Sequence, residues 1–157
     1  MTQSSLAPSG LTHALTVLLA ALAGAFLGGV VNMTVILASA AALPPPAGVD
    51  VNDAASINAH IHEYSVVQLL CPFFAHAIGT FVGAIVATKV GARAGVGRIA
   101  AFLVGLLFLA GGVGAVAMIP NAPLWFSALD LGVAYLPMAH LGHKLARQKD
   151  ASQHRAR

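Results

Sequence analysis

Three long stretches without Asp, Glu, Lys or Arg constrain the fold of this chain more than any other feature. They cover residues 1–49, 64–88 and 99–129. A helix of about 20 residues crosses a hydrocarbon core about 30 Å thick, so each stretch is long enough to span a membrane. Charged residues make up 8% of the 157 residues, whereas ordinary soluble domains contain about 25%. The chain is therefore expected to be an integral membrane protein.

The third stretch is too long for a single span. Two prolines and an asparagine at 120–123 predict a tight turn that divides it. The apolar runs are continuous and rich in Ala and Leu, which favours helices over the alternating strands of a membrane barrel. We predict an all-α, single-domain bundle of four transmembrane helices at about 12–36, 65–88, 99–119 and 124–144.

The basic residues predict the orientation of the bundle. All eight Lys and Arg residues lie in 89–98 or after residue 143, whereas the connection at 44–64 has three acidic residues and no basic one. Cytoplasmic loops are enriched in Lys and Arg. The loop at 44–64 should thus face outward, and the tail at 145–157 and both termini should be cytoplasmic. Because the basic residues mark this side, we expect the lipid bilayer, and no nucleic acid, as a partner.

The first span has one competing interpretation, a cleaved signal peptide. Ala38-Ser39-Ala40 resembles a small-residue cleavage site. The first ten residues contain no Lys or Arg, and the apolar run exceeds the usual 7–15 residues of a signal peptide. A retained helix is therefore expected.

The outward loop is the largest polar segment. Prolines at 44–46 end any continuing helix. Asp50, Asn52 or Asp53 can then cap a short helix at 54–63 by accepting a free backbone amide. The apolar residues that share one face of this helix are Ile57, Ile61 and Tyr64. This stripe predicts a helix that lies on the membrane surface.

Small residues recur at helical spacing within the spans. In lipid, helices associate mainly through close packing of such residues. The predicted helix-packing residues are Gly24, Gly28, Ala75, Gly79, Gly83 and Ala87. These faces are expected to pack inside the bundle or against another subunit.

Polar residues at membrane depth form the candidate functional site. Asp130 lies near the start of the fourth span and His76 near the middle of the second. Other embedded groups that can bond with this pair are Asn32, Gln68 and Tyr135. Acidic residues in spans face protein or water. The pair predicts either a proton or cation path or an interhelical hydrogen bond that fixes helix register.

Other features predict less. Pro72 and Pro137 lie within spans and are expected to bend their helices. His60 and His62 would point to opposite faces of a helix, so neither a metal site nor any other cofactor is expected there. His140 and His143 are interpreted as interfacial side chains. The sequence predicts no catalytic residue.

Several short motifs occur together in this chain. They are Pro46-Ala47-Gly48-Val49-Asp50, Ala75-His76 followed by Gly79, Met118-Ile119-Pro120, and Pro123-Leu124-Trp125-Phe126 followed by Asp130. In these motifs the chain resembles a group of small bacterial inner-membrane proteins with four helices, whose function is not established. The resemblance implies an inner-membrane location and a shared fold, and it implies no activity.

Two functions compete. The abundance of small-residue faces and the scarcity of reactive groups favour a non-enzymatic accessory or scaffold subunit that packs against itself or a larger membrane complex. The alternative is a small proton- or cation-coupled carrier or channel that uses Asp130 and His76. An enzyme is not expected. Catalysis needs a nucleophile, a metal or an acid–base pair within mutual reach, and only His76 and Asp130 could supply one.

Overall fold

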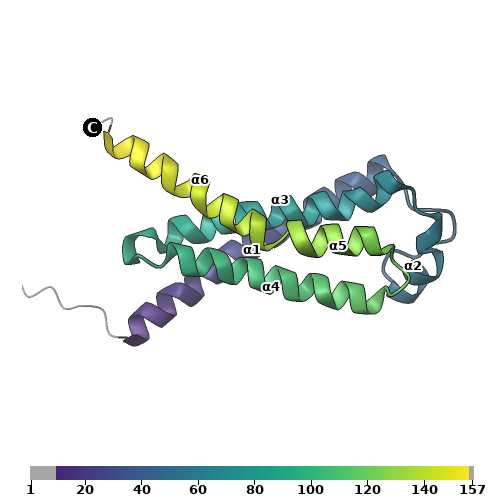
Figure 1. Cartoon of the computed structure of the whole chain (residues 1–157), viewed down its shortest axis with the longest axis horizontal. Helices are drawn as coiled ribbons and strands as arrows, with labels where there is room; N and C mark the ends of the chain where they lie inside the picture. The colour runs from purple at the N-terminus through teal and green to yellow at the C-terminus, as the bar shows by residue number, and fades with distance from the viewer. Residues whose placement is uncertain (1–9, 156–157) are drawn as a thin grey trace, which may run out of the picture.

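The computed structural model describes residues 10–155, and this part of the chain is helical, without a strand (Figure 1). Its elements are α1 (Gly10–Ala42), α2 (Ala54–His60), the 3-10 turn η1 (Ile61–Glu63), α3 (Val66–Gly91), the 3-10 turn η2 (Ala92–Ala94), α4 (Gly97–Met118), α5 (Leu124–Val133) and α6 (Leu136–Arg155). Four segments are long and apolar enough to cross a membrane: α1, α3 with η2, α4, and α5 with most of α6. The predicted all-α bundle of four transmembrane helices is confirmed.

Two of the spans differ from the sequence prediction in shape. Helix α1 has 33 residues, so it extends beyond the expected 12–36 at both ends. It ends just before the prolines at 44–46, which cannot donate the backbone hydrogen bonds that continue a helix. The fourth span is broken, because α5 ends at Val133 and α6 begins at Leu136. The bend expected at Pro137 is thus a full break, since proline has no amide hydrogen for the Val133 carbonyl.

Helices α1 and α3 pack through glycines that leave no room for a side chain. A Cβ added at Gly28 would lie 2.6 Å from the Gly79 carbonyl oxygen, and one added at Gly83 would lie 2.7 Å from the Gly24 carbonyl oxygen. Two further members of this face are fully buried, Ala75 and Ala87. Such close approach maximises van der Waals contact between helices in lipid. The predicted small-residue faces of α1 and α3 therefore meet each other within one chain.

Helices α3, α4 and α6 share a second contact layer. Ala84, Ala101 and Ala139, one from each helix, are fully buried against one another. The turn that reverses the chain between α3 and α4 contains Gly95 at φ +70°, a left-handed conformation that glycine adopts without steric cost. This layer joins the second, third and fourth spans.

The connection between α1 and α3 folds over one end of the bundle. Asp53 begins α2, because its Oδ1 accepts the Ala55 amide hydrogen at 2.9 Å. The Asn121 amide donates to Asn58 Oδ1 at 2.9 Å and so ties α2 to the α4–α5 turn. The short loop helix is confirmed, and Asp53 is the capping residue among the three candidates.

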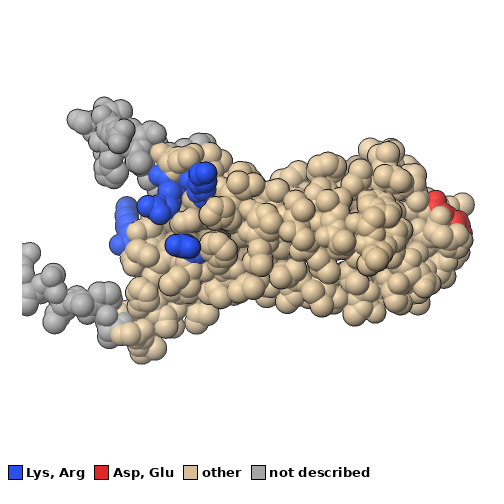
Figure 2. Space-filling view, viewed as in Figure 1, with Lys and Arg blue, Asp and Glu red and all other residues tan. Residues whose placement is uncertain are grey.

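Charged side chains separate to opposite ends of the molecule (Figure 2). The described basic residues at one end, here the basic end, are Lys89, Arg93, Arg98, Lys144 and Arg147. The acidic residues at the opposite end, here the acidic end, are Asp50, Asp53 and Glu63. Between the ends, large apolar side chains such as Leu22 and Phe26 are 62% and 71% exposed. This distribution is that of a membrane protein, whose apolar belt contacts lipid tails.

Candidate functional site

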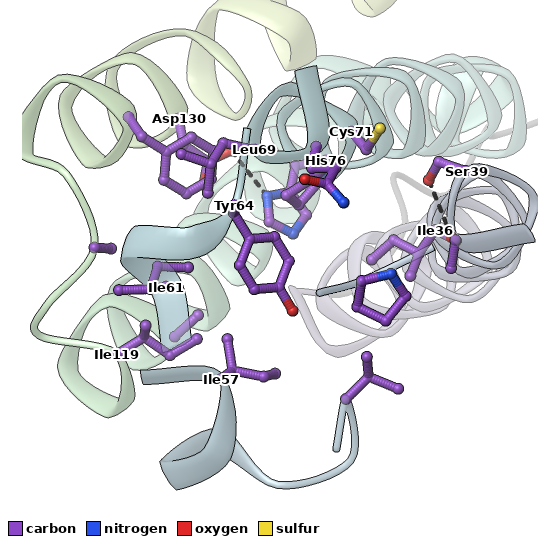
Figure 3. Close-up of a pocket in the computed structure, with 18 of the residues that line it drawn as sticks. Ile36, Ser39, Ile57, Ile61, Tyr64, Leu69, Cys71, His76, Ile119 and Asp130 are labelled. Atoms are coloured by element: carbon purple, nitrogen blue, oxygen red, sulfur yellow. Dashed lines mark hydrogen bonds and ion pairs between the residues drawn. The ribbon is translucent and has the colours of Figure 1, made fainter. Parts of the chain in front are cut away.

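A pocket of 360 Å³ lies in the acidic half of the bundle, between α1, α2, α3, α4 and α5 (Figure 3). Most of its wall is apolar and includes Ile36, Leu43, Ile57, Ile61, Leu69 and Phe126. His76 and Asp130 also line it. They are the eleventh residue of α3 and the seventh of α5, which places them roughly 15 Å and 9 Å along these helices at 1.5 Å per residue. The pocket therefore leads to two ionisable groups at membrane depth.

Asp130, His76 and Tyr135 form one hydrogen-bonded network. The imidazole Nδ1 of His76 lies 2.8 Å from Asp130 Oδ1, as Figure 3 shows. The Tyr135 hydroxyl donates to Asp130 Oδ2 at 2.8 Å and lies 3.0 Å from His76 Nδ1. The rings of His76 and Tyr135 stack, with centroids 5.6 Å apart. Three of the five polar residues selected from the sequence are thus in direct contact.

One arrangement of hydrogens satisfies both contacts to Asp130. The His76 Nδ1–H donates to Asp130 Oδ1, and the Tyr135 O–H donates to Oδ2. Each oxygen of the Asp130 carboxyl group then accepts one hydrogen bond. The second ring nitrogen, Nε2 of His76, holds either a lone pair or a proton.

His76 faces the pocket more than Asp130 does. The side chain of His76 is 23% exposed, whereas that of Asp130 is 5% exposed. In Figure 3 one nitrogen of the His76 ring points to Asp130 and the other points away from it, into the pocket. Asp130 therefore reaches the pocket mainly through His76. This arrangement resembles a carboxylate that orients an imidazole for proton transfer.

The break between α5 and α6 positions two members of the network. Asp130 lies in the last turn of α5, and Tyr135 lies in the break itself. A Cβ added at Gly112 on α4 would lie 2.7 Å from Tyr135 Cζ, so this glycine provides the space for the phenol ring. The missing backbone bond at Pro137 frees the chain to turn Tyr135 back towards Asp130.

Gln68 and Asn32 do not join the network. Gln68 and Ser65 form a capping box at the start of α3, and the Gln68 amide donates to the Pro44 carbonyl at 2.7 Å. Asn32 packs against Gly79, and its buried Oδ1 has no hydrogen-bond partner among the described residues. Gln68 therefore joins the first and second spans at the acidic end, while Asn32 belongs to the α1–α3 contact.

The apolar stripe of α2 and η1 covers the pocket. The sequence predicted that Ile57, Ile61 and Tyr64 lie on the membrane surface, and this prediction is wrong. All three line the pocket, and Ile61 is only 6% exposed. The pocket offers these side chains an apolar surface within the protein, and burial there replaces contact with lipid. The loop helix therefore forms the roof of the pocket at the acidic end.

Several polar groups on the other side of the network were not selected from the sequence. Thr80 is fully buried, and its hydroxyl oxygen has no partner in the described part of the chain. Thr88 Oγ1 lies 3.1 Å from His143 Nδ1, and His143 is 7% exposed. His143 is thus packed against α3 at the basic end, near Arg98 and Arg147, and its position at the membrane interface stays a prediction. Thr80 follows His76 by four residues, about one turn of α3, and this spacing is the signal that could have identified it.

Metal-ligating side chains do not gather in the described residues. His62 and Glu63 lie 3.9 Å apart and are exposed. No group of three His, Cys, Asp or Glu side chains within residues 10–148 is close enough to hold an ion.

Comparison of the chain with family models, curated proteins and solved structures gave no match. The resemblance to small bacterial four-helix proteins stays a prediction.

Proposed function

We propose that this protein is a small proton-coupled carrier or channel, in which His76 and Asp130 bind the transported or coupling proton. One observation carries the proposal. A carboxylate that is 5% exposed is held by an imidazole whose other nitrogen faces a 360 Å³ pocket at membrane depth. A proton that enters the pocket meets His76 first, because Asp130 is less exposed and lies 2.8 Å behind the imidazole.

An ionisable residue at position 130 is difficult to explain by packing alone. A carboxylate within a span costs about 2.5–3.5 kcal/mol on insertion scales. Hydrogen bonds between helices contribute only about 0.6–2 kcal/mol. A neutral amide could contact both His76 and Tyr135 at a lower insertion cost. The acid in this place therefore favours a role that needs a change of charge.

The broken fourth span supports the same proposal. Transporters commonly place their substrate and ion sites beside discontinuous helices near the middle of the bilayer. Here the break at 134–135 lies between α5 and α6 and carries Tyr135, while Asp130 lies one turn earlier. Thr80, whose buried hydroxyl has no hydrogen-bond partner among the described residues, extends the polar side chains of α3 one turn beyond His76 towards the basic end.

An accessory or scaffold subunit is the second candidate. The faces that suggested it in α1 and α3 are occupied within the chain. Its remaining support is the exposed side of α4, where a Cβ added at Gly111 or Gly114 would meet no described atom within 4 Å. Native mass spectrometry after gentle extraction tests this candidate. It predicts a homo-oligomer or an unrelated partner, whereas a monomer in native-like lipid would oppose it.

For the location, we propose a bacterial inner membrane with both termini in the cytoplasm. The concentration of Lys and Arg at the basic end supports this orientation. The pocket then opens on the outer side of the membrane.

Proton flux into liposomes tests the proposal. Purified protein is reconstituted with a trapped pH-sensitive dye, and a potassium gradient with valinomycin sets the membrane potential. We expect the wild type to acidify the lumen faster than protein-free liposomes. Asp130→Asn should lower the flux to the protein-free level, because the amide cannot balance an imidazolium.

A matched control separates proton transfer from general damage. His62→Gln changes a histidine whose side chain is 75% exposed at the acidic end, so it should leave the flux unchanged. All variants should elute as folded species in size-exclusion chromatography. Equal flux in wild type and Asp130→Asn would contradict the proposal.

A further inference from the structure

A second pocket, of 500 Å³, lies at the basic end between α3, α4 and α6. Its lining includes Arg98 in the first turn of α4 and Arg147 on α6. In residues 10–148 the side-chain ion pairs are His62–Glu63 and His76–Asp130, so neither guanidinium is neutralised by a described carboxylate. Two unneutralised cations from different helices therefore converge on one cavity.

Buried and backbone donors complete the lining of this pocket. His143 is 7% exposed, and its Nδ1 contacts Thr88, which leaves Nε2 without a partner among the described residues. Helix α4 begins at Gly97 after Val96, which provides no side-chain cap. The first amides of α4 thus receive no hydrogen bond from a Val96 side chain, and the helix dipole adds positive potential there.

We infer that this second pocket binds a phosphate group, with Arg98 and Arg147 as its main ligands. A guanidinium offers paired donors that match phosphate oxygens, and the uncapped amides of α4 add further donors. Basic pockets between transmembrane helices on the cytoplasmic side are known to hold anionic lipid headgroups. The phosphate can belong to such a lipid or be free in solution. This inference does not depend on the proton site near the acidic end.

Native mass spectrometry with defined lipids tests the inference. The purified protein is titrated with phosphatidylglycerol or with phosphatidylcholine. In phosphatidylcholine the choline cation of the same headgroup masks the phosphate charge. We expect one phosphatidylglycerol to be retained by the wild type. The double variant Arg98→Gln/Arg147→Gln should bind it about tenfold more weakly, since two charge-assisted contacts are lost.

The matched control is Lys89→Gln/Arg93→Gln. All four positions are exposed at the same end, and the control removes the same charge from the two that do not line the pocket. Its affinity for phosphatidylglycerol should fall by less than about twofold, as expected for surface charges screened by salt. An equal loss in the two double variants would show attraction to the surface in general and overturn the inference.

Inorganic phosphate distinguishes the two sources. If millimolar phosphate displaces phosphatidylglycerol from the wild type, the pocket accepts free phosphate as well as a headgroup. If phosphatidylglycerol stays bound in the presence of millimolar phosphate, the pocket holds a lipid phosphate. Retention of neither probe by folded wild-type protein would overturn the inference.

Discussion

At the scale of single residues, the hydrogen-bonded network of Asp130, His76 and Tyr135 depends on a glycine that packs against the tyrosine ring. Tyr135 donates to Asp130 only if its ring lies against α4, and Gly112 provides that space. Sequence reasoning selected Asp130, His76 and Tyr135 because polar groups are rare at membrane depth. It could not exclude Asn32, because depth in a span is readable from the sequence and the direction of a side chain is not. For Gln68 the signal was present, since Ser65-x-x-Gln68 is a capping-box pattern.

Substitution of Gly112 should displace Tyr135. A Cβ there would meet the ring at 2.7–2.8 Å, so Gly112→Ala should destabilise the protein by about 1–3 kcal/mol, as overpacking does. Gly111→Ala is the matched control, since its Cβ would meet no described atom within 4 Å. Thermal unfolding in detergent should show a lower Tm for the first variant alone. Equal Tm values for both variants would contradict the placement of Tyr135.

At the scale of elements, the sequence predicts the α1–α3 contact better than it predicts the roof of the pocket. The glycine spacing predicted close packing, and the structure supplies the partner. The stripe of α2 is apolar, as the sequence predicts, but it faces the pocket and not the lipid. The helical periodicity of apolar residues identifies an apolar face. Whether that face contacts lipid or protein depends on the tertiary arrangement around the pocket.

The α1–α3 contact should tolerate no methyl group at Gly28. Gly28→Ala places a Cβ 2.6 Å from a backbone oxygen of α3, which cannot move without separating the helices. We expect a loss of about 1–3 kcal/mol in the free energy of unfolding. Gly29→Ala, one residue later and open within 4 Å, should be close to neutral. Steric-trap or denaturant unfolding measures both, and similar losses would contradict the packing described.

The roof of the pocket should respond to alkaline pH through Tyr64. Burial raises the pKa of the Tyr64 phenol above its ordinary value of 10.0. The folded state thus favours the neutral phenol, so stability is unchanged below pH 10 and falls as the pH rises through the raised pKa. Absorbance titration of Tyr135→Phe, which leaves Tyr64 as the one tyrosine, should give a higher midpoint when folded than when unfolded. Identical midpoints would show that Tyr64 is solvated.

At the scale of the whole molecule, the separation of charge indicates how the bundle lies in a membrane. Basic residues gather at one end and acidic residues at the other, with an apolar belt between them (Figure 2). This was predictable from the sequence, because long charge-free runs and positions of Lys and Arg need no tertiary information. The two pockets were not predictable, since each is lined by several helices that are distant in the sequence.

Cysteine accessibility should confirm the orientation of the bundle. In a Cys71→Ser background, Ala59→Cys reports on the loop helix and Ala94→Cys on the turn between α3 and α4; both positions are exposed. In intact bacterial cells, a membrane-impermeant maleimide should label the cysteine at 59. The cysteine at 94 should be labelled only after lysis. The reverse pattern would contradict the proposed topology.

The most direct test of the central claim, that the buried network binds a proton, is infrared difference spectroscopy during a pH change on the reconstituted protein. We expect a histidine or carboxyl protonation signal in the wild type that disappears in Asp130→Asn. The signal should shift in Tyr135→Phe, because the phenol donates to Asp130 Oδ2 at 2.8 Å. A spectrum that is unchanged in Asp130→Asn would contradict the account.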